Sequence, residues 1–283
     1  MNRLRSIARA VRHAPGLRSA GWLWDRLRKP YERLLDWSGR GVPVLIGGSC
    51  RARMPPEFAA GDHEGYERES FAALSGWLRA HPNALFVDVG CAFGLYSVAA
   101  LFVSERVDGV AIDSNLVALK SARRLCRYAS GQRLRVVHGF AAQESRSGMD
   151  LSAAAAETER RLAACAASGD PGTEDTYILI DQNSDPTIPT HSLDRLLVNE
   201  PHDRPLLIKI DVEGAELLVL QGAQSVLREN APALLVSVHR DRLGVFHQSV
   251  QDVRDFLAGL GYVIEVLAVD HEEHWWCRRK DRS

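Results

Sequence analysis

Five short segments of the chain are apolar at almost every position and end at an acid, a glycine or a turn: Ala84–Val89, Val107–Ile112, Leu134–His138, Leu206–Ile210 and Ala233–Val238. Runs that are apolar throughout, rather than at alternate positions, are typical of strands covered on both faces of a sheet. Three of these runs are followed by apolar residues at helical spacing, in Tyr96–Val103, Leu116–Tyr128 and Ala215–Leu227. Strands that alternate with helices predict right-handed crossovers and a parallel sheet.

The pattern continues after the fifth strand. Val250–Leu260 has the spacing of a helix that ends at Gly261, and Tyr262–Val269 and His274–Arg278 have the composition of two further strands. We expect these two strands to form a hairpin at the edge of the sheet. The predicted fold is therefore α/β: a Rossmann-like, seven-stranded, mostly parallel sheet with helices on both faces and a terminal β-hairpin, in a main domain of residues 84–283.

Two segments lie outside this alternation. Residues 1–83 are predicted to form a basic N-terminal helical extension, with a strand-like Val42–Ile46 and a helix near Glu69–Arg79. Residues 145–175 contain the Ala-rich Leu151–Ala167, whose composition favours an inserted helix that could serve as a lid or as a contact in a homodimer.

Composition and charge exclude several classes of protein. The 283 residues include 35 Lys and Arg against 36 Asp and Glu, and 46% of them are hydrophobic, which excludes a disordered, collagen-like or disulfide-scaffold chain. The near-zero net charge conceals an asymmetry, because residues 1–53 hold 12 Lys and Arg but only three acids. This basic block could recognise an acidic or phosphorylated ligand, or lie on an anionic membrane surface.

Cysteine usage and the N-terminus bear on the cellular compartment. Five scattered cysteines without a Cys-x-x-Cys pair predict free thiols in a reducing cytosol and no structural metal. No window reaches the ~18–20 uninterrupted apolar residues of a membrane span. Five arginines interrupt the apolar run that a secretory signal would need in the first 24 residues. We expect a cytoplasmic protein, with peripheral membrane contact through the basic N-terminus as the alternative.

The first predicted strand leads into a glycine turn that is typical of nucleotide-cofactor sites. Asp88 lies at the end of the strand, Gly90 and Gly94 follow, and a helix then begins. Gly90 permits a sharp turn, and Gly94 permits a close approach of the chain to a ligand. The second strand ends near Asp113, whose carboxylate could accept hydrogen bonds from both ribose hydroxyls of an adenosine. Together these residues predict an adenosine-cofactor site at the ends of adjacent strands.

The form of the turn distinguishes between adenosine cofactors. A dinucleotide fingerprint has three glycines, whereas Ala92 and Phe93 stand here where a pyrophosphate needs bare backbone. The carboxylate of Asp88 is a poor neighbour for phosphates and a good one for the ammonium group of S-adenosylmethionine, which we therefore predict as the cofactor. Two alternatives are an NAD-dependent oxidoreductase and a non-catalytic module that binds an adenosine cofactor or a nucleic acid.

A second group of acids follows the fourth strand, in the run Ile208-Lys209-Ile210-Asp211-Val212-Glu213-Gly214-Ala215-Glu216. Open α/β sheets hold ligands at this edge, so Asp211 and Glu213 could act as a base or as ligands of a hard metal ion. Glu213 could instead stabilise the start of the next helix electrostatically, and we expect Glu216 to belong to a capping pattern.

This run, with Val219-Leu220-Gln221-Gly222-Ala223 after it, resembles the signature of the FkbM family of class I S-adenosylmethionine-dependent methyltransferases. Weaker matches occur in the family's order over roughly residues 60–265, among them Tyr66-Glu67 and Thr190-His191-Ser192-Leu193-Asp194. The resemblance implies an O-methyltransferase (EC 2.1.1) whose acceptor is a hydroxyl of a sugar, a glycan or a secondary metabolite. We expect no nucleic-acid partner.

The chain also departs from the family pattern. Ala92 replaces the family's Asn in the glycine turn, and Asp113 replaces a Glu and is followed by Ser114 rather than Pro. Ser237, near the end of the fifth strand, stands where a Glu is often found. Asp for Glu preserves ribose binding, whereas Ala92 removes a side-chain contact and Ser237 removes a carboxylate.

These observations define the candidate site residues. A hydroxyl acceptor must lose its proton to a base or be activated by a metal, and the catalytic candidates are His239 at the tip of the fifth strand, Asp211 and Glu213. The three could together hold a divalent ion, but we predict no metal site. Trp275 and Trp276 could stack on a sugar or complete the core. To the cofactor we assign Glu67, Asp88, Gly90, Ala92, Gly94, Tyr96, Ser97, Asp113, Ser114, Ala141 and Asp211.

Overall fold

The computed structural model of the protein describes residues 41–129, 133–168 and 187–280, together with Pro30, Trp37 and Gly39. Of the predicted basic extension of residues 1–83, residues 1–29 and all but three of residues 30–40 lie outside the described residues, as do residues 169–186. Among the described residues, no helix is both long and apolar enough to span a bilayer.

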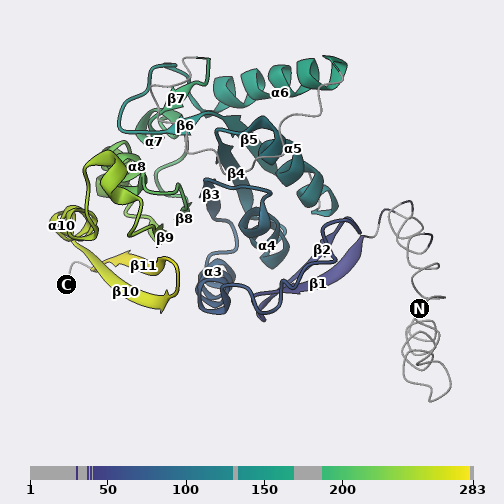
Figure 1. The fold of residues 1–283 in the computed structure, drawn as a ribbon, viewed down its shortest axis with the longest axis horizontal. Helices are drawn as coiled ribbons and strands as arrows, with labels where there is room; N and C mark the ends of the chain where they lie inside the picture. The colour runs from purple at the N-terminus through teal and green to yellow at the C-terminus, as the bar shows by residue number, and fades with distance from the viewer. Residues whose placement is uncertain are drawn as a thin grey trace.

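A seven-stranded sheet forms the centre of the molecule, with strand order β10-β11-β9-β8-β3-β4-β5 (Figure 1). The five strands from β9 to β5 are parallel, and β11 is antiparallel to both of its neighbours. These strands are the seven that the apolar runs predict, so the sequence-based fold is confirmed. Their bounds are β3 Leu85–Val89, β4 Asp108–Asp113, β5 Leu134–His138, β8 Leu206–Ile210, β9 Ala233–Val238, β10 Tyr262–Val269 and β11 Glu273–Arg279.

Helices cover both faces of the sheet because successive residues of each strand point to opposite sides. In β3, Val87 belongs to one hydrophobic cluster and Phe86 to the other. Phe86 faces the side of α3 (Arg68–Ala80), α4 (Leu95–Val103) and α5 (Leu116–Leu125), the last extended by the 3-10 turn η1 (Cys126–Tyr128). The opposite face carries α7 (Leu193–Leu196), α8 (Glu216–Gln221), α9 (Gln224–Glu229) and α10 (Val250–Gly259). The Ala-rich helix α6 (Leu151–Ser168) packs along β5 (Figure 1).

An antiparallel hairpin precedes the sheet and shares its core. The sequence predicts the first strand, β1 (Val42–Ile46), but not the second, β2 (Cys50–Met54). In β2 the buried residues Cys50, Ala52 and Met54 alternate with Arg51 and Arg53. Ile46 and Met54 are fully buried in the same cluster as α3 and α4, so this part of the predicted extension packs directly on the main domain.

Several further features differ from the expected elements or decide between alternatives. The predicted helix Ala215–Leu227 is divided into α8 and α9, because Gly222 lies so close to the Ala142 carbonyl that a Cβ would be 2.0 Å from its oxygen. A short parallel pair, β6 (Phe140–Ala141) and β7 (Thr190–His191), and a 3-10 turn η2 (Leu243–Phe246) were not predicted. Trp275 and Trp276 are buried and therefore complete the core, and all five cysteines are free thiols.

Candidate functional site

A cavity of about 250 Å³ lies at the carboxyl ends of β3, β4, β8 and β9. One side is formed by the glycine turn after β3, the end of β4 and the short strand β6. The other side is formed by the acids after β8, the end of β9 and the turn before β11. Six of the predicted cofactor residues line this cavity: Gly90, Ala92, Asp113, Ser114, Ala141 and Asp211.

The glycine turn brings three strands together at one point. Gly90 has a φ of 76°, and a Cβ on it would lie 1.7 Å from the carbonyl oxygen of Asp211. The backbone N–H groups of Gly90 and Cys91 both donate to the Ile112 carbonyl, at 2.9 and 3.1 Å. Only glycine allows the ends of β3, β4 and β8 to approach this closely.

Asp113 occupies the place predicted for the ribose-binding acid. Its Oδ2 accepts a hydrogen bond from the Ala92 N–H at 2.9 Å, and its Oδ1 accepts one from the Asn115 N–H at 2.8 Å. Burial raises the pKa of this carboxyl to about 6, although the two N–H groups oppose the shift. A carboxylate oxygen can accept more than one hydrogen bond, so Asp113 can also bind hydroxyls from the cavity side.

The remaining predicted cofactor residues lie behind the cavity wall. Ser97 donates to Asp88 at 2.6 Å, and burial raises the pKa of Asp88 to about 6. The Tyr96 hydroxyl donates to Glu67, and both side chains are buried. With Gly94, these residues support the wall of the cavity and do not line it.

Lys209 is fully buried beneath the side of the cavity that the acids after β8 form. It was not among the site residues predicted from the sequence. Its Nζ donates to Asp211 Oδ2 at 2.8 Å and to Ser237 Oγ at 2.6 Å, and it lies 5.0 Å from the centre of the Tyr96 ring. Burial alone would lower the pKa of Lys209, but the charges of Asp211, Glu67 and Glu272 together outweigh this and raise it. The pKa of Asp211 is lowered because the ammonium group opposes the effect of its own burial.

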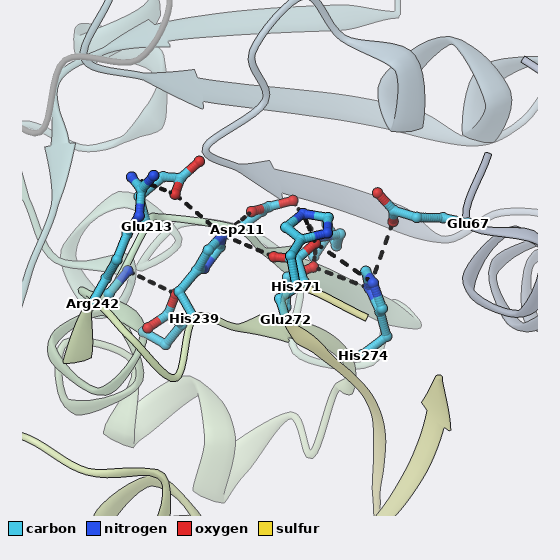
Figure 2. A network of polar contacts seen from close by, with 12 residues as sticks. Glu67, Asp211, Glu213, His239, Arg242, His271, Glu272 and His274 are labelled. Atoms are coloured by element: carbon cyan, nitrogen blue, oxygen red, sulfur yellow. Dashed lines mark hydrogen bonds and ion pairs between the residues drawn. The ribbon is translucent and has the colours of Figure 1, made fainter. Parts of the chain in front are cut away.

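His239 is the centre of a cluster of acids (Figure 2). Its Nδ1 lies 2.7 Å from Glu216 Oε1, and its Nε2 lies 2.8 Å from Glu272 Oε2. Asp211 Oδ1 and Glu213 Oε2 are 3.6 and 3.3 Å from Nε2. Burial alone would lower the pKa of His239, but these carboxylates raise it to about 10. A pKa of about 10 leaves the imidazole positively charged at neutral pH.

Two ion-paired groups lie at opposite ends of this cluster (Figure 2). At one end, Arg242 pairs with Glu213 at 2.8 Å, and both line the cavity. At the other, His274 lies 3.7 Å from Glu67 and 3.5 Å from Glu272, all three being buried. Glu67, Ala92 and Glu213 are non-glycine residues with positive φ, a strained conformation that clusters at functional sites.

Asp211, Glu213 and His239 lie together, as the sequence predicts, whereas Glu272 and His274 were not predicted as parts of the site. These two residues belong to a segment whose place next to β9 depends on the insertion of β11. The run His271-Glu272-Glu273-His274 is a signal for a polar site, although nothing local connects it to the ends of the other strands.

The chain resembles one protein family and several solved structures. A family model described as the methyltransferase FkbM domain matches residues 88–264. Among solved structures, a methyltransferase FkbM from Methylobacillus flagellatus KT is 18% identical, with 75% of this chain and 46% of that chain covered and a TM-score of 0.47. This chain thus spans less than half the length of that protein.

Two other solved structures are also similar. A precorrin-6y C5,15-methyltransferase from Geobacter metallireducens GS-15 is 13% identical, with 81% of this chain and 97% of that chain covered and a TM-score of 0.47. An O-methyltransferase from Bacillus cereus, in complex with S-adenosylhomocysteine, is 11% identical, with 79% and 86% covered and a TM-score of 0.42. No protein of curated function matches the chain.

Proposed function

The chain belongs to the FkbM methyltransferase family, and on that premise we propose that it transfers a methyl group from S-adenosylmethionine to a hydroxyl of a sugar, a glycan or a secondary metabolite. Among the function classes that the sequence left open, family membership selects the methyltransferase over the oxidoreductase and the non-catalytic binding module. The observation that carries the proposal is the cavity in which Gly90, Asp113 and the acids after β8 meet.

The lining of the cavity suits this cofactor. Gly90 lines the cavity and lets the glycine turn pack against the Asp211 carbonyl, and Asp113 offers carboxylate lone pairs to the ribose. The carboxylates of Asp211, Glu213 and Glu272 face the same space, which favours a ligand with sulfonium and ammonium groups over one with phosphates. When bound, S-adenosylmethionine supplies a methyl group that is already activated by the positive sulfur.

The residues of this chain must orient the acceptor and remove its proton. His239 is 7% exposed, and both of its ring nitrogens are engaged by carboxylates. The side chain of Glu213 is 32% exposed, and it lines the cavity beside Arg242. We therefore assign the proton-accepting role to Glu213 rather than His239, with Arg242 holding its carboxylate in place.

The cofactor assignment is tested by calorimetric titration with S-adenosylhomocysteine. Asp113→Ala should weaken binding ~30-fold or more, because hydrogen bonds to a charged group contribute about 1.5–3 kcal/mol each. The matched control is Asp108→Ala, at the opposite end of β4, where Asp108 pairs with Arg204 outside the cavity. If the wild type does not bind, the methyltransferase proposal is wrong. If Asp113→Ala binds as well as the wild type, the ribose assignment is wrong.

The catalytic assignment is tested by release of S-adenosylhomocysteine in a screen of hydroxyl acceptors. Glu213→Gln should lower the rate about 10²–10⁴-fold, the usual contribution of a general base, with little change in S-adenosylhomocysteine affinity. Glu265→Gln, an exposed acid on β10 that does not line the cavity, serves as the control. A Glu213→Gln enzyme of undiminished rate would remove Glu213 from the mechanism.

A further inference from the structure

Three side chains from separate strand ends converge beside the cofactor cavity (Figure 2). Asp211 follows β8, His239 follows β9, and Glu272 immediately precedes β11. Each offers one ligand atom, and the three atoms lie within 4.8 Å of one another. All three residues line the cavity, so an ion and its remaining ligands have a path to this point.

The orientation of His239 is determined by Glu216, which is completely buried. Glu216 Oε1 accepts from the Gly214 N–H at 2.9 Å and lies 2.7 Å from His239 Nδ1. A carboxylate on one imidazole nitrogen commonly orients the other nitrogen toward a metal. Here the other nitrogen, Nε2, faces Asp211 and Glu272.

Glu272 supplies an independent indication of a ligand. Its side chain is 4% exposed, and its Oε2 accepts no hydrogen bond from the described residues, although it lies 2.8 Å from His239 Nε2. Two atoms close together without hydrogen-bond geometry are arranged as neighbouring ligands of one ion, since ligand distances of about 2.0–2.2 Å place adjacent ligands roughly 3 Å apart. A buried carboxylate oxygen that accepts no hydrogen bond is otherwise costly.

We propose that Asp211, His239 and Glu272 form a divalent-cation site at the wall of the cofactor cavity. Two carboxylate oxygens and one imidazole nitrogen suit Mn²⁺, and Mg²⁺ with lower affinity. The cation takes the place of the proton on His239 Nε2, because only a neutral imidazole coordinates a metal. The sequence alone suggests Glu213, with Asp211 and His239, as the third ligand of such an ion. The structure favours Glu272, because Glu213 is paired with Arg242 at 2.8 Å.

The role of the cation rests on the proposed function, whereas its binding does not. A coordinated acceptor hydroxyl has a lowered pKa, which matters because a carboxylate alone is a weak base for an alcohol. The hydroxyl oxygen then forms a bond to the methyl carbon while the carbon–sulfur bond breaks. The hydroxyl proton passes to Glu213, and neutral S-adenosylhomocysteine leaves.

The site is tested on the full chain, stripped of metal, by titration with Mn²⁺ followed by electron paramagnetic resonance. We expect one bound Mn²⁺ per chain, with affinity lowered at least tenfold in Asp211→Asn, His239→Gln and Glu272→Gln. Glu216→Gln should weaken binding about 10–100-fold, as expected for a group that orients a ligand. Glu265→Gln, on the same hairpin as Glu272, should bind Mn²⁺ as the wild type does.

A spectroscopic measurement identifies the ligand without relying on variants. The electron spin echo of bound Mn²⁺ should show coupling to an imidazole ¹⁴N in the wild type, and His239→Gln should abolish this coupling. If the wild type binds no Mn²⁺, or binds it without nitrogen coupling, the proposal is overturned.

Two other groups of residues include Glu272 and compete with the proposed set: Glu67 with His274, and Asp270 with His271. Mn²⁺ binding that survives in His239→Gln but is lost in His274→Gln or His271→Gln would also overturn the proposal. Titration of every variant with S-adenosylhomocysteine separates the two proposals. Absence of Mn²⁺ binding in a wild type that binds the cofactor refutes the cation site alone. Mn²⁺ binding in a wild type that does not bind the cofactor refutes the methyltransferase proposal alone.

Discussion

The two sides of the cavity are constructed in different ways. The side formed by the glycine turn and the end of β4 consists mainly of backbone, and its shape depends on close contacts such as that of Gly90 with the Asp211 carbonyl. The other side consists of buried charged side chains around Lys209 and His239. The structure of the first side should therefore depend on the volume of its residues, and the structure of the second side on their charge. Substitutions that change one property at a time can therefore test this contrast.

Gly90→Ala should produce the largest effect. The added Cβ overlaps the Asp211 carbonyl and requires a positive φ, which together cost about 2–5 kcal/mol of unfolding free energy, and binding of S-adenosylhomocysteine should be lost. Gly76→Ala is the control, because Gly76 lies in α3 with nothing within 4 Å of an added Cβ. That change should stabilise the protein by up to about 1 kcal/mol. Thermal unfolding that is unchanged in Gly90→Ala would show that the backbone contact is not required.

Lys209→Met tests the charged side. Methionine fills a similar volume but leaves the carboxylate of Asp211 without its ammonium partner, which should lower the unfolding free energy by about 3 kcal/mol. The double variant Lys209→Met, Asp211→Asn should recover part of this loss, since no unpaired charge remains. Denaturant unfolding measures both values. A single variant as stable as the wild type would contradict the importance of charge balance in this region.

A moderate effect is expected from pH on the cofactor side. The pKa of Asp113 is about 6, and only its ionised form accepts hydrogen bonds with both oxygens, so S-adenosylhomocysteine affinity should fall about tenfold between pH 7.5 and pH 5. Asp113→Asn should remove the part of this dependence that belongs to Asp113. The unfolding free energy of the ligand-free protein should change with pH in the opposite direction to the affinity. Because the pKa is raised on folding, the stability contributed by protonated Asp113 is lost as the pH rises through about 6.

Ala92→Gly should have the smallest effect and the opposite direction. Ala92 adopts a φ of 46°, and glycine would relieve this left-handed conformation, stabilising the protein by about 1 kcal/mol. The same change at Ala72, an exposed position in α3, should destabilise by about 1 kcal/mol. Melting temperatures that shift in the same direction for both variants would show that Ala92 is not strained.

The parts of the structure that the sequence predicts are those determined by local patterns. Most of the seven strands were identified because their runs are apolar and bounded by turn residues, and Gly90 and Asp113 were placed at the cavity because they lie at the ends of such runs. Asp88 also ends such a run, but it bonds Ser97 behind the cavity wall and does not line the cavity as predicted. The strand β2 was missed, although Cys50, Ala52 and Met54 alternate with arginines as a half-buried strand requires. Its short length and its charge concealed a pattern that was present.

Other parts depend on contacts that no local pattern contains. The break between α8 and α9 follows from the approach of Ala142 to Gly222, from a segment 80 residues earlier in the sequence. Glu272 reaches His239 only because β11 is inserted between β9 and β10. The burial of Lys209 could be inferred from its strand, and Asp211 is only two residues away, but its contact with Ser237 depends on the pairing of β8 with β9.

The insertion of β11 also has a consequence for the synthesis of the protein. A ribosome that has released the chain only as far as β10 exposes the apolar edge of β9, because the strand that covers it has not yet been made. Such an edge invites pairing with other chains until it is covered. Glu272 and His274 join the acid–histidine cluster only when β11 is in place. An incomplete polypeptide therefore carries the cofactor turn but not the complete acid–histidine cluster, and full assembly of the site is delayed until the strands are nearly all synthesised.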